Sequence, residues 1–270
     1  MNTWYDENPP VPAPMGVLNW TLAGARFVLI SVVISILMGP MLILRWLRYS
    51  SASQALVKLA CALILCVMGL RVRCIGIPMK MQGGVVANHS SWLDIFVLNA
   101  VQQVHFVSKA EVAKWPVIGI IARLVGTIFI ERKQSHAAKH RDTFQNRLSV
   151  GHRLLFFPEG TSTDGQRVLT FKSTLFAAFF DPSVRKRAWV QCLTVAYVAP
   201  PKQDVRYYGW WGDTNFFPHF FNVLGQLKQG RVTVTFHSPV KVADVVDRKA
   251  LAQMTHATVA AGLTNALDIC

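Results

Sequence analysis

The strongest candidate for chemistry is a histidine with a carboxylate five residues further along the chain. His89 and Asp94 lie in the run NHSSWLD, residues 88–94, directly after a short β-rich stretch. An imidazole can take a proton from a hydroxyl, and a neighbouring carboxylate fixes its tautomer and stabilises the imidazolium that forms. The pattern predicts a general base with its orienting partner. The alternative interpretation is that His89 caps a helix or packs in a core.

Helix geometry restricts how these two side chains can meet. Residues five apart on a regular helix point about 140° away from each other. We therefore expect His89 at a strand–helix turn, with Asp94 reaching back from the first helical turn. Loops at strand ends are where sites collect in α/β folds, so we expect this pair at one edge of a sheet.

Two further strands are expected to end in polar groups. The run LLFFPEGTS, residues 154–162, ends in a turn with one carboxylate and two hydroxyls. The run GTIFIER, residues 126–132, ends in a charge pair. Taken singly, the first could be an ordinary turn with a solvated Glu and the second a surface ion pair of little energetic value. Together with His89 and Asp94, they predict the rim of an active site.

Common cofactor and hydrolase motifs are absent from the sequence. It contains no GxSxG, GxGxxG, GxxxxGK[ST], HExxH or CxxC pattern. These motifs carry covalent serine catalysis, dinucleotide binding, phosphate cradling and zinc binding. We therefore expect neither a cofactor nor a metal site.

The three motifs resemble those of the glycerophospholipid acyltransferase family, specifically the 1-acyl-sn-glycerol-3-phosphate (lysophosphatidate) acyltransferases. Asn88, His89 and Asp94 match the family's NHxxxxD block. Residues 126–132, ending in Arg132, match its GxIFIxR-like strand, and residues 157–161 match its FPEGT block. The similarity covers about residues 80–200, in the family's order and spacing.

This resemblance implies an O-acyltransferase with His89 as base and Asp94 as its support. His89 would take the proton from the free hydroxyl of a lysophospholipid, and that hydroxyl would attack an acyl thioester. The donor would be acyl-CoA or acyl-carrier protein, and the expected acceptor is 1-acyl-sn-glycerol-3-phosphate, giving phosphatidic acid. The implied substrate-binding residues are Asn88, Arg132, Glu159, Gly160 and Thr161.

Two departures from the family pattern leave the acceptor open. Ser162 follows Thr161 where the family usually has Arg, so one cationic phosphate contact is missing or comes from elsewhere. Lys109 and Lys172 are candidates to supply it, although each could be an ordinary surface lysine. The strand at residues 190–193 also lacks the proline of the family's fourth block. A lyso-ornithine lipid is therefore an alternative acceptor.

The residues that must position this chemistry form an alternating pattern of strands and helices, which predicts an α/β fold with a mixed central sheet flanked by helices. Expected strands are Val72–Ile77, Val85–Ala87, Val104–Val107, Gly126–Ile130, Leu154–Phe157, Val190–Val198 and Arg231–Phe236. Expected helices are Ser91–Val101, Ala110–Val125, Ser135–Val150, Thr174–Phe180, Asn215–Lys228 and Ala243–Leu267.

The N-terminal part of the chain is expected to anchor it to a membrane. Phe27–Leu44 contains 18 residues without a charge, enough for a helix of about 27 Å, close to the hydrocarbon thickness of a bilayer. We expect a kink at Gly39-Pro40, and Arg26 reaching a headgroup. The 12-residue run Leu59–Leu70 is short for a span and is interpreted as interfacial, re-entrant or half of a shallow hairpin.

The distribution of charge supports the same division of the chain. Of 270 residues, 28 are Lys or Arg and 14 are Asp or Glu, a net charge of +14. Four basic and two acidic residues precede residue 71, which leaves +12 downstream. We therefore expect anchoring helices over residues 1–70 and an acyltransferase domain over 71–270, held against anionic lipids. The positive-inside rule places that domain on the cytoplasmic face, at a bacterial inner membrane.

Two functions of other classes compete with acyl transfer. A basic protein that tethers nucleic acid or a partner to the membrane would explain the charge equally well, but not the two strand-end motifs, so we expect no nucleic-acid partner. A lipid hydrolase would need no acceptor, and the missing GxSxG argues against it. The aromatic stretch from Trp210 to His219 is expected to pack or to contact the membrane.

Overall fold

The structure is a computed structural model that describes residues 4–11, 14–47, 49–114, 119, 122–123, 126–130, 145–148 and 151–268. Within these residues, eight strands form one sheet in the order β1-β7-β6-β2-β5-β3-β4, and β8 pairs with β6. Their bounds are Arg71–Ile75 (β1), Gly83–Ala87 (β2), His105–Lys109 (β3), Ile128–Ile130 (β4), Arg153–Phe156 (β5), Trp189–Val198 (β6), Arg231–Phe236 (β7) and Val240–Lys241 (β8).

The sheet is mixed, as the sequence predicts. Strands β2, β5, β3 and β4 are neighbours and run parallel, and β6 joins β2 in the same direction. Strand β7 is antiparallel to β6, and β1 is parallel to β7. Because β2 and β5 are parallel neighbours, the turns that follow Ala87 and Phe156 meet at the same edge.

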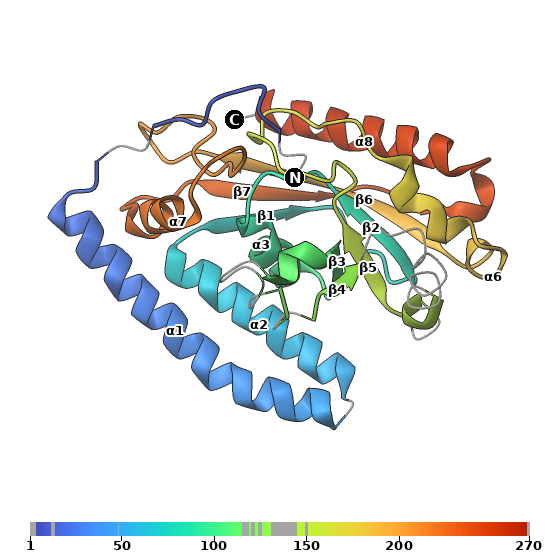
Figure 1. Ribbon diagram of the computed structural model, residues 1–270, viewed down its shortest axis with the longest axis horizontal. Helices are drawn as coiled ribbons and strands as arrows, with labels where there is room; N and C mark the ends of the chain where they lie inside the picture. The colour runs from blue at the N-terminus through green and yellow to red at the C-terminus, as the bar shows by residue number, and fades with distance from the viewer. Residues whose placement is uncertain are drawn as a thin grey trace.

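Helices cover both faces of the sheet (Figure 1). The α-helices are α1 (Val17–Trp46), α2 (Ser50–Met68), α3 (Leu93–Val101), α6 (Pro182–Arg185), α7 (Phe216–Gly225) and α8 (Arg248–Asp268). Short 3₁₀ segments are η1 (Ala110–Lys114), η3 (Ser173–Phe180) and η4 (Val242–Asp244). In Figure 1, α8 lies along one side of the sheet, and α1, α2 and α3 lie on the other.

Strand β2 shows how the sheet separates two apolar cores. Successive side chains of a strand point to opposite faces. Val85 and Ala87 belong to the core formed with α1, α2, α3 and α7, while Val86 belongs to the core formed with α8 and η3. All five residues of β2 are buried. A parallel strand covered on both faces reads as a continuous apolar run rather than an alternating one.

The seven strands expected from the sequence are all present, with their ends at most two residues from the expected positions. Strand β8, two residues long, was not predicted because it is too short to carry a pattern. The expected helix at 174–180 is a 3₁₀ segment, and the final helix begins at Arg248 because η4 occupies 242–244. The expected helix over 135–150 falls largely outside the described residues, and so does most of 115–125.

Helices α1 and α2 pack against each other as a hairpin along one side of the molecule (Figure 1). Helix α1 has 30 residues and continues through Pro40, and α2 has 19. The 12-residue run Leu59–Leu70 therefore lies largely inside a longer helix, which begins nine residues earlier among residues of mixed polarity. Of the interpretations of this run, half of a hairpin is the one that the structure matches.

Both ends of the hairpin return to the α/β part of the chain. After Gly69 in a left-handed turn, α2 leads into β1. Before α1, the Glu7 carboxylate pairs with Arg167 at 2.6 Å and with Arg206 at 3.1 Å. The expectation for Arg26 was wrong: its guanidinium donates to the carbonyls of Leu224 and Gln226, at 2.7 and 2.8 Å, instead of extending to a lipid headgroup.

Candidate active site

The turn between β2 and α3 brings His89 and Asp94 together. His89 lies two residues after β2, and Asp94 is the second residue of α3. The distance from His89 Nδ1 to Asp94 Oδ2 is 2.8 Å. This is the arrangement that the five-residue spacing requires, because the histidine lies off the helix and the aspartate reaches back from its first turn.

The Asp94 carboxylate is fully buried and receives four hydrogen bonds. Besides the imidazole, Oδ2 accepts from the backbone N–H of Ser90 at 2.8 Å and of Ser91 at 3.0 Å. Oδ1 accepts from the hydroxyl of Tyr197 at 2.7 Å. Burial raises the pKa of Tyr197 well above its ordinary value, so its hydroxyl remains a donor. Four donors fix the carboxylate in one orientation.

This carboxylate also fixes the tautomer of His89. A carboxylate oxygen accepts, so Nδ1 must carry the hydrogen that is donated, and Nε2 is then the nitrogen with a lone pair. The side chain of His89 is 21% exposed, whereas that of Asp94 is 0% exposed. An imidazole that can be reached from outside is thus paired with a carboxylate that cannot be reached.

Phe157, the first residue of the FPEGT turn, stacks on the His89 ring. The ring centroids are 4.0 Å apart, and the planes differ by 8°. The face of an aromatic ring carries negative charge density and favours a cation above it. This contact fixes the plane of the imidazole ring against the face of Phe157.

The Glu159 side chain links the FPEGT turn to the turn that holds His89. Its Oε1 accepts from the backbone N–H of His89 at 2.7 Å, and its Oε2 accepts from that of Leu169 at 2.7 Å. The residue is only 1% exposed. Sequence analysis expects Glu159 to bind substrate; since both oxygens are already engaged with backbone donors, we propose instead that it positions the two loops.

The protonation of Glu159 is set by opposing influences. Burial raises its pKa from 4.5 to about 8, and Asp94 and Asp164 nearby act in the same direction. The two backbone N–H groups lower the pKa, because they stabilise the ionised form. Burial is the larger influence, so the fold favours the protonated form of this carboxyl group.

Asn88 fastens the catalytic turn to β6. Its Nδ2 donates to the carbonyl of Val195 at 2.9 Å, and its Oδ1 accepts from the Val195 N–H at 2.8 Å. The side chain is buried and replaces a strand partner just where β2 ends. As with Glu159, this pairing supports a positioning role, although sequence analysis expects Asn88 to bind substrate.

Gly160 and Lys172 lie against each other at the FPEGT turn. Gly160 has a φ of +76°, and a Cβ added there would lie 2.9 Å from Lys172 Nζ. The turn therefore needs glycine for its left-handed backbone. Lys172 Nζ lies beside the turn, and its role as a source of the missing charge stays a prediction.

Three further residues were predicted to bind substrate: Thr161, Lys109 and Arg132. Thr161 is partly exposed in the same turn. The Ser162 hydroxyl donates to the carbonyl of Trp210 at 2.5 Å, so the residue that replaces the family's Arg serves packing. Lys109 is the last residue of β3. Arg132 lies outside the described residues, and both roles stay predictions.

Sequence analysis missed Tyr197 as part of the site. It lies 103 residues from Asp94, and a lone tyrosine in an apolar strand carries no motif. The one usable signal is that a phenol in a buried strand must find a hydrogen-bond partner. Phe157 was noted as part of the FPEGT block, but nothing in its spacing indicates that it stacks on His89.

Comparison with known proteins places this geometry in a family. The model of the Acyltransferase family matches residues 73–195. A lyso-ornithine lipid O-acyltransferase from Rhodobacter capsulatus is 47% identical over 211 residues, covering 78% of this chain and 76% of the relative. One of the same name from Brucella abortus is 40% identical over 215 residues, covering 74% and 78%.

A 1-acyl-sn-glycerol-3-phosphate acyltransferase from Neisseria gonorrhoeae is 30% identical over 195 residues, covering 68% of this chain and 71% of the relative. The crystal structure of PlsC, the 1-acyl-sn-glycerophosphate acyltransferase of Thermotoga maritima, has the same fold. Its TM-score is 0.64 at 20% identity, with 92% of this chain and 95% of that one covered.

The chain belongs to the glycerophospholipid acyltransferase family. It is an O-acyltransferase of the lysophospholipid type, which takes an acyl donor and a lipid acceptor. Helix α1 and residues 51–68 of α2 are each long and apolar enough to cross a membrane. Only 11% of the most apolar 18-residue stretch of α1 is buried, whereas a core helix of a soluble protein is mostly buried. With its relatives, this makes the protein membrane-associated.

Proposed function

We propose that the protein transfers a fatty acyl group from an acyl thioester to the free hydroxyl of a lyso-ornithine lipid. Acyl-CoA and acyl-carrier protein are the two candidate donors, each as a substrate rather than a bound cofactor. Lysophosphatidate is the second candidate acceptor. We place the reaction on the cytoplasmic face of a bacterial inner membrane, where the downstream excess of +12 favours contact with anionic lipids.

The observation that carries the choice of acceptor is Ser162. A glycerol-phosphate headgroup is a dianion that favours several cations, whereas an ornithine headgroup pairs one carboxylate with one ammonium. At the position where the family usually has Arg, Ser162 is occupied with the Trp210 carbonyl. Lys172 at the FPEGT turn suits a single carboxylate. The names of the Rhodobacter and Brucella relatives support the same choice.

In the proposed mechanism, Nε2 of His89 accepts the proton of the lipid hydroxyl as its oxygen attacks the thioester carbonyl carbon. A carbon–oxygen bond forms, and the resulting imidazolium is stabilised by Asp94 and lies against the face of Phe157. The carbon–sulfur bond then breaks. The leaving thiolate takes the proton back from His89, so the base is regenerated without a net change in protonation.

The test is product analysis by mass spectrometry. Purified full-length protein receives acyl-CoA together with lyso-ornithine lipid or, in parallel, lysophosphatidate in mixed micelles. We expect the O-acylated ornithine lipid to accumulate faster. If phosphatidic acid is the main product, the acceptor is lysophosphatidate instead of the ornithine lipid, and acyl transfer remains the reaction. Release of free fatty acid without either product would overturn acyl transfer.

As a variant test of the same point, Ser162→Arg restores the cation that the family usually carries. We expect this change to raise the ratio of phosphatidic acid to acylated ornithine lipid. Lys172→Gln should lower turnover with both acceptors, because each contains an anionic group. An unchanged ratio in the Ser162→Arg variant would show that this position does not select the headgroup.

A further inference from the structure

Helix α7 has an inner face that packs on the protein and an outer face on which Phe217, Pro218 and Phe221 lie beside one polar residue, Asn222. The Asn215 side chain caps its start by accepting from the Phe217 N–H at 3.2 Å. His219, Val223 and Leu224 are buried. Phe217 and Phe221 are four residues apart and so lie on one side of the helix. Phe217 is 50% exposed.

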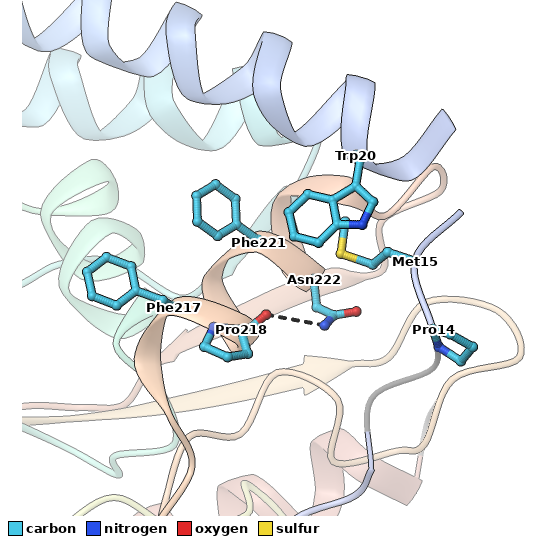
Figure 2. Close-up of a pocket in the computed structure, with 7 residues that line it drawn as sticks. All are labelled: Pro14, Met15, Trp20, Phe217, Pro218, Phe221 and Asn222. Carbon is cyan, nitrogen blue, oxygen red and sulfur yellow. Dashed lines mark hydrogen bonds between the residues drawn. The ribbon is translucent and has the colours of Figure 1, made fainter. Parts of the chain in front are cut away.

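An open groove of about 500 Å³ separates this outer face from the start of α1 (Figure 2). Met15 and Trp20 form one wall, and Phe217, Pro218 and Phe221 form the other. Figure 2 shows Trp20 and Phe221 next to each other; their ring centroids are 5.9 Å apart and their planes are tilted by 43°. Exposed apolar patches are typical of surfaces that bind a protein or a membrane.

Helices α1 and α7 are joined as one rigid unit. Arg26 donates to the carbonyls of Leu224 and Gln226 at the end of α7, where a cation also complements the helix dipole. Asn19 donates to the Gly225 carbonyl at 3.0 Å. A Cβ on Gly225 would lie 2.8 Å from the Asn19 carbonyl oxygen, so only glycine allows this approach. Wherever α1 lies relative to the bilayer, α7 goes with it.

Exposed apolar side chains lie on both sides of the groove, at the start of α1 and on α7. Val17 and Leu18, beside Trp20, are 83% and 63% exposed. Beyond the end of α7, Leu227 is 53% exposed and is followed by the exposed Lys228. Aromatic and apolar side chains next to a cation are typical of the boundary between acyl chains and headgroups.

The inner face of α7 contacts the catalytic turn directly. Trp92, two residues before Asp94, donates from Nε1 to His219 Nδ1 at 3.0 Å. The Trp92 ring also packs edge-on against Phe216, with centroids 5.7 Å apart. One helix therefore connects the turn that holds His89 and Asp94 with the apolar surface that continues from α1.

We propose that the outer face of α7 enters the lipid bilayer beside the start of α1, as a third membrane contact in addition to the hairpin. The occupant of the groove is then the lipid surface itself. The inner face of α7 holds the catalytic turn directly over this surface, where the hydroxyl of a lysolipid lies. The proposal concerns docking and does not depend on which acceptor is used.

A fluorescent label tests the position of α7 without measuring activity. Full-length protein with Phe217→Cys carries a nitrobenzoxadiazole label, after the exposed Cys66 and Cys74 and the terminal Cys270 have been changed to serine. It is bound to vesicles of phosphatidylethanolamine and phosphatidylglycerol that contain a headgroup-level nitroxide lipid. The matched control is Val246→Cys, an apolar residue that is 83% exposed beside α6, at the other end of the molecule from α7 (Figure 1).

We expect the label at 217 to shift to the blue and to be quenched by the nitroxide, and the label at 246 to do neither. Equal, water-like emission from both positions would overturn the proposal. As a second measurement, Phe217→Asp should lower turnover of a vesicle-embedded acceptor by roughly tenfold, because an aromatic ring leaves the apolar phase. Val246→Asp should not. Equal turnover by the two variants would also overturn it.

Discussion

Two ring contacts of a histidine lie at opposite edges of the same parallel strands, and they differ in the surroundings that each imidazole meets. At the carboxyl edge, His89 stacks on Phe157 at 4.0 Å and donates to a carboxylate. At the amino edge, where β3 and β5 begin, the ring centroids of His105 and His152 are 4.1 Å apart and the ring planes are tilted by 30°. A histidine contacts a second ring at a similar distance at both edges, whereas the partner ring, the tilt and the hydrogen-bond partner differ.

At the amino edge, the surroundings oppose a positive charge. Burial, the neighbouring His152 imidazole and the charges of Arg147 and Arg45 lower the pKa of His105 to about 4. Its Nδ1 lies 3.3 Å from the Gln54 amide nitrogen, a neutral partner. Burial also lowers the pKa of His152. The surroundings of His105 therefore disfavour a protonated imidazole, whereas His89 at the carboxyl edge has a carboxylate partner.

The largest expected effect is that of His89→Ala. Loss of the base should reduce acyl transfer by roughly 10³-fold or more, measured with a labelled thioester. The matched control is His152→Ala, which removes an imidazole in ring contact with His105 at the opposite edge and should leave turnover within about twofold. Substantial residual turnover in His89→Ala, with membrane association intact, would reject His89 as the base.

The second largest effect is expected for Asp94→Asn, which should reduce acyl transfer by roughly 10²-fold. This loss is smaller than that of His89→Ala because the imidazole remains. The amide offers one acceptor atom where the carboxylate offers two, so one of its four donors meets an NH₂ group. Thioester consumption should fall without a change in vesicle binding. Turnover equal to wild type would show that the carboxylate is structural.

Glu159→Gln should reduce stability by about 1–3 kcal/mol at pH 5, because one backbone N–H loses its acceptor. Since the folded pKa of about 8 is above the ordinary 4.5, the contribution of Glu159 is full below pH 4.5 and declines as pH rises through 8. Denaturant unfolding in micelles should therefore show a wild-type advantage that narrows between pH 5 and 8. An advantage that grows with pH would contradict the raised pKa.

Tyr197→Phe should have the smallest effect, about a tenfold loss of kcat with KM unchanged. Without the hydroxyl, Asp94 loses one of the four donors that fix its orientation, so His89 is held less well. Tyr208→Phe is the control, because this buried phenol donates to Gln229 instead of Asp94. An equal loss of kcat in both variants would assign Tyr197 to packing alone.

The parts of the site that could be predicted are those encoded locally. His89 and Asp94 are separated by one turn, so their spacing already limited how they could meet. Tyr197 could not be found in this way, since its position depends on β6 pairing with β2 across about a hundred residues. The sequence predicted that Glu159 lies at the end of a strand, but not where its side chain points. That direction is decided by the backbone N–H groups of His89 and Leu169, which donate to its two oxygens.

The fold shows the same division. Apolar runs bounded by turn residues gave the strands and the mixed sheet, whereas β8 depends on its pairing with β6 rather than on a pattern of its own. The partner of Arg26 was mistaken because a positive charge beside an apolar run looks the same whether it meets a headgroup or the end of another helix. Only the position of α7 decides between the two.

The two ion pairs of Glu7 can form only late in the synthesis of this chain. Their partners Arg167 and Arg206 are 160 and 199 residues further on, so neither contact can close until most of the polypeptide has left the ribosome. Helix α1 emerges long before them, and α7 later still. The apolar hairpin therefore meets the translation machinery and the lipid phase as a nascent segment, and the enzyme is completed around it afterwards.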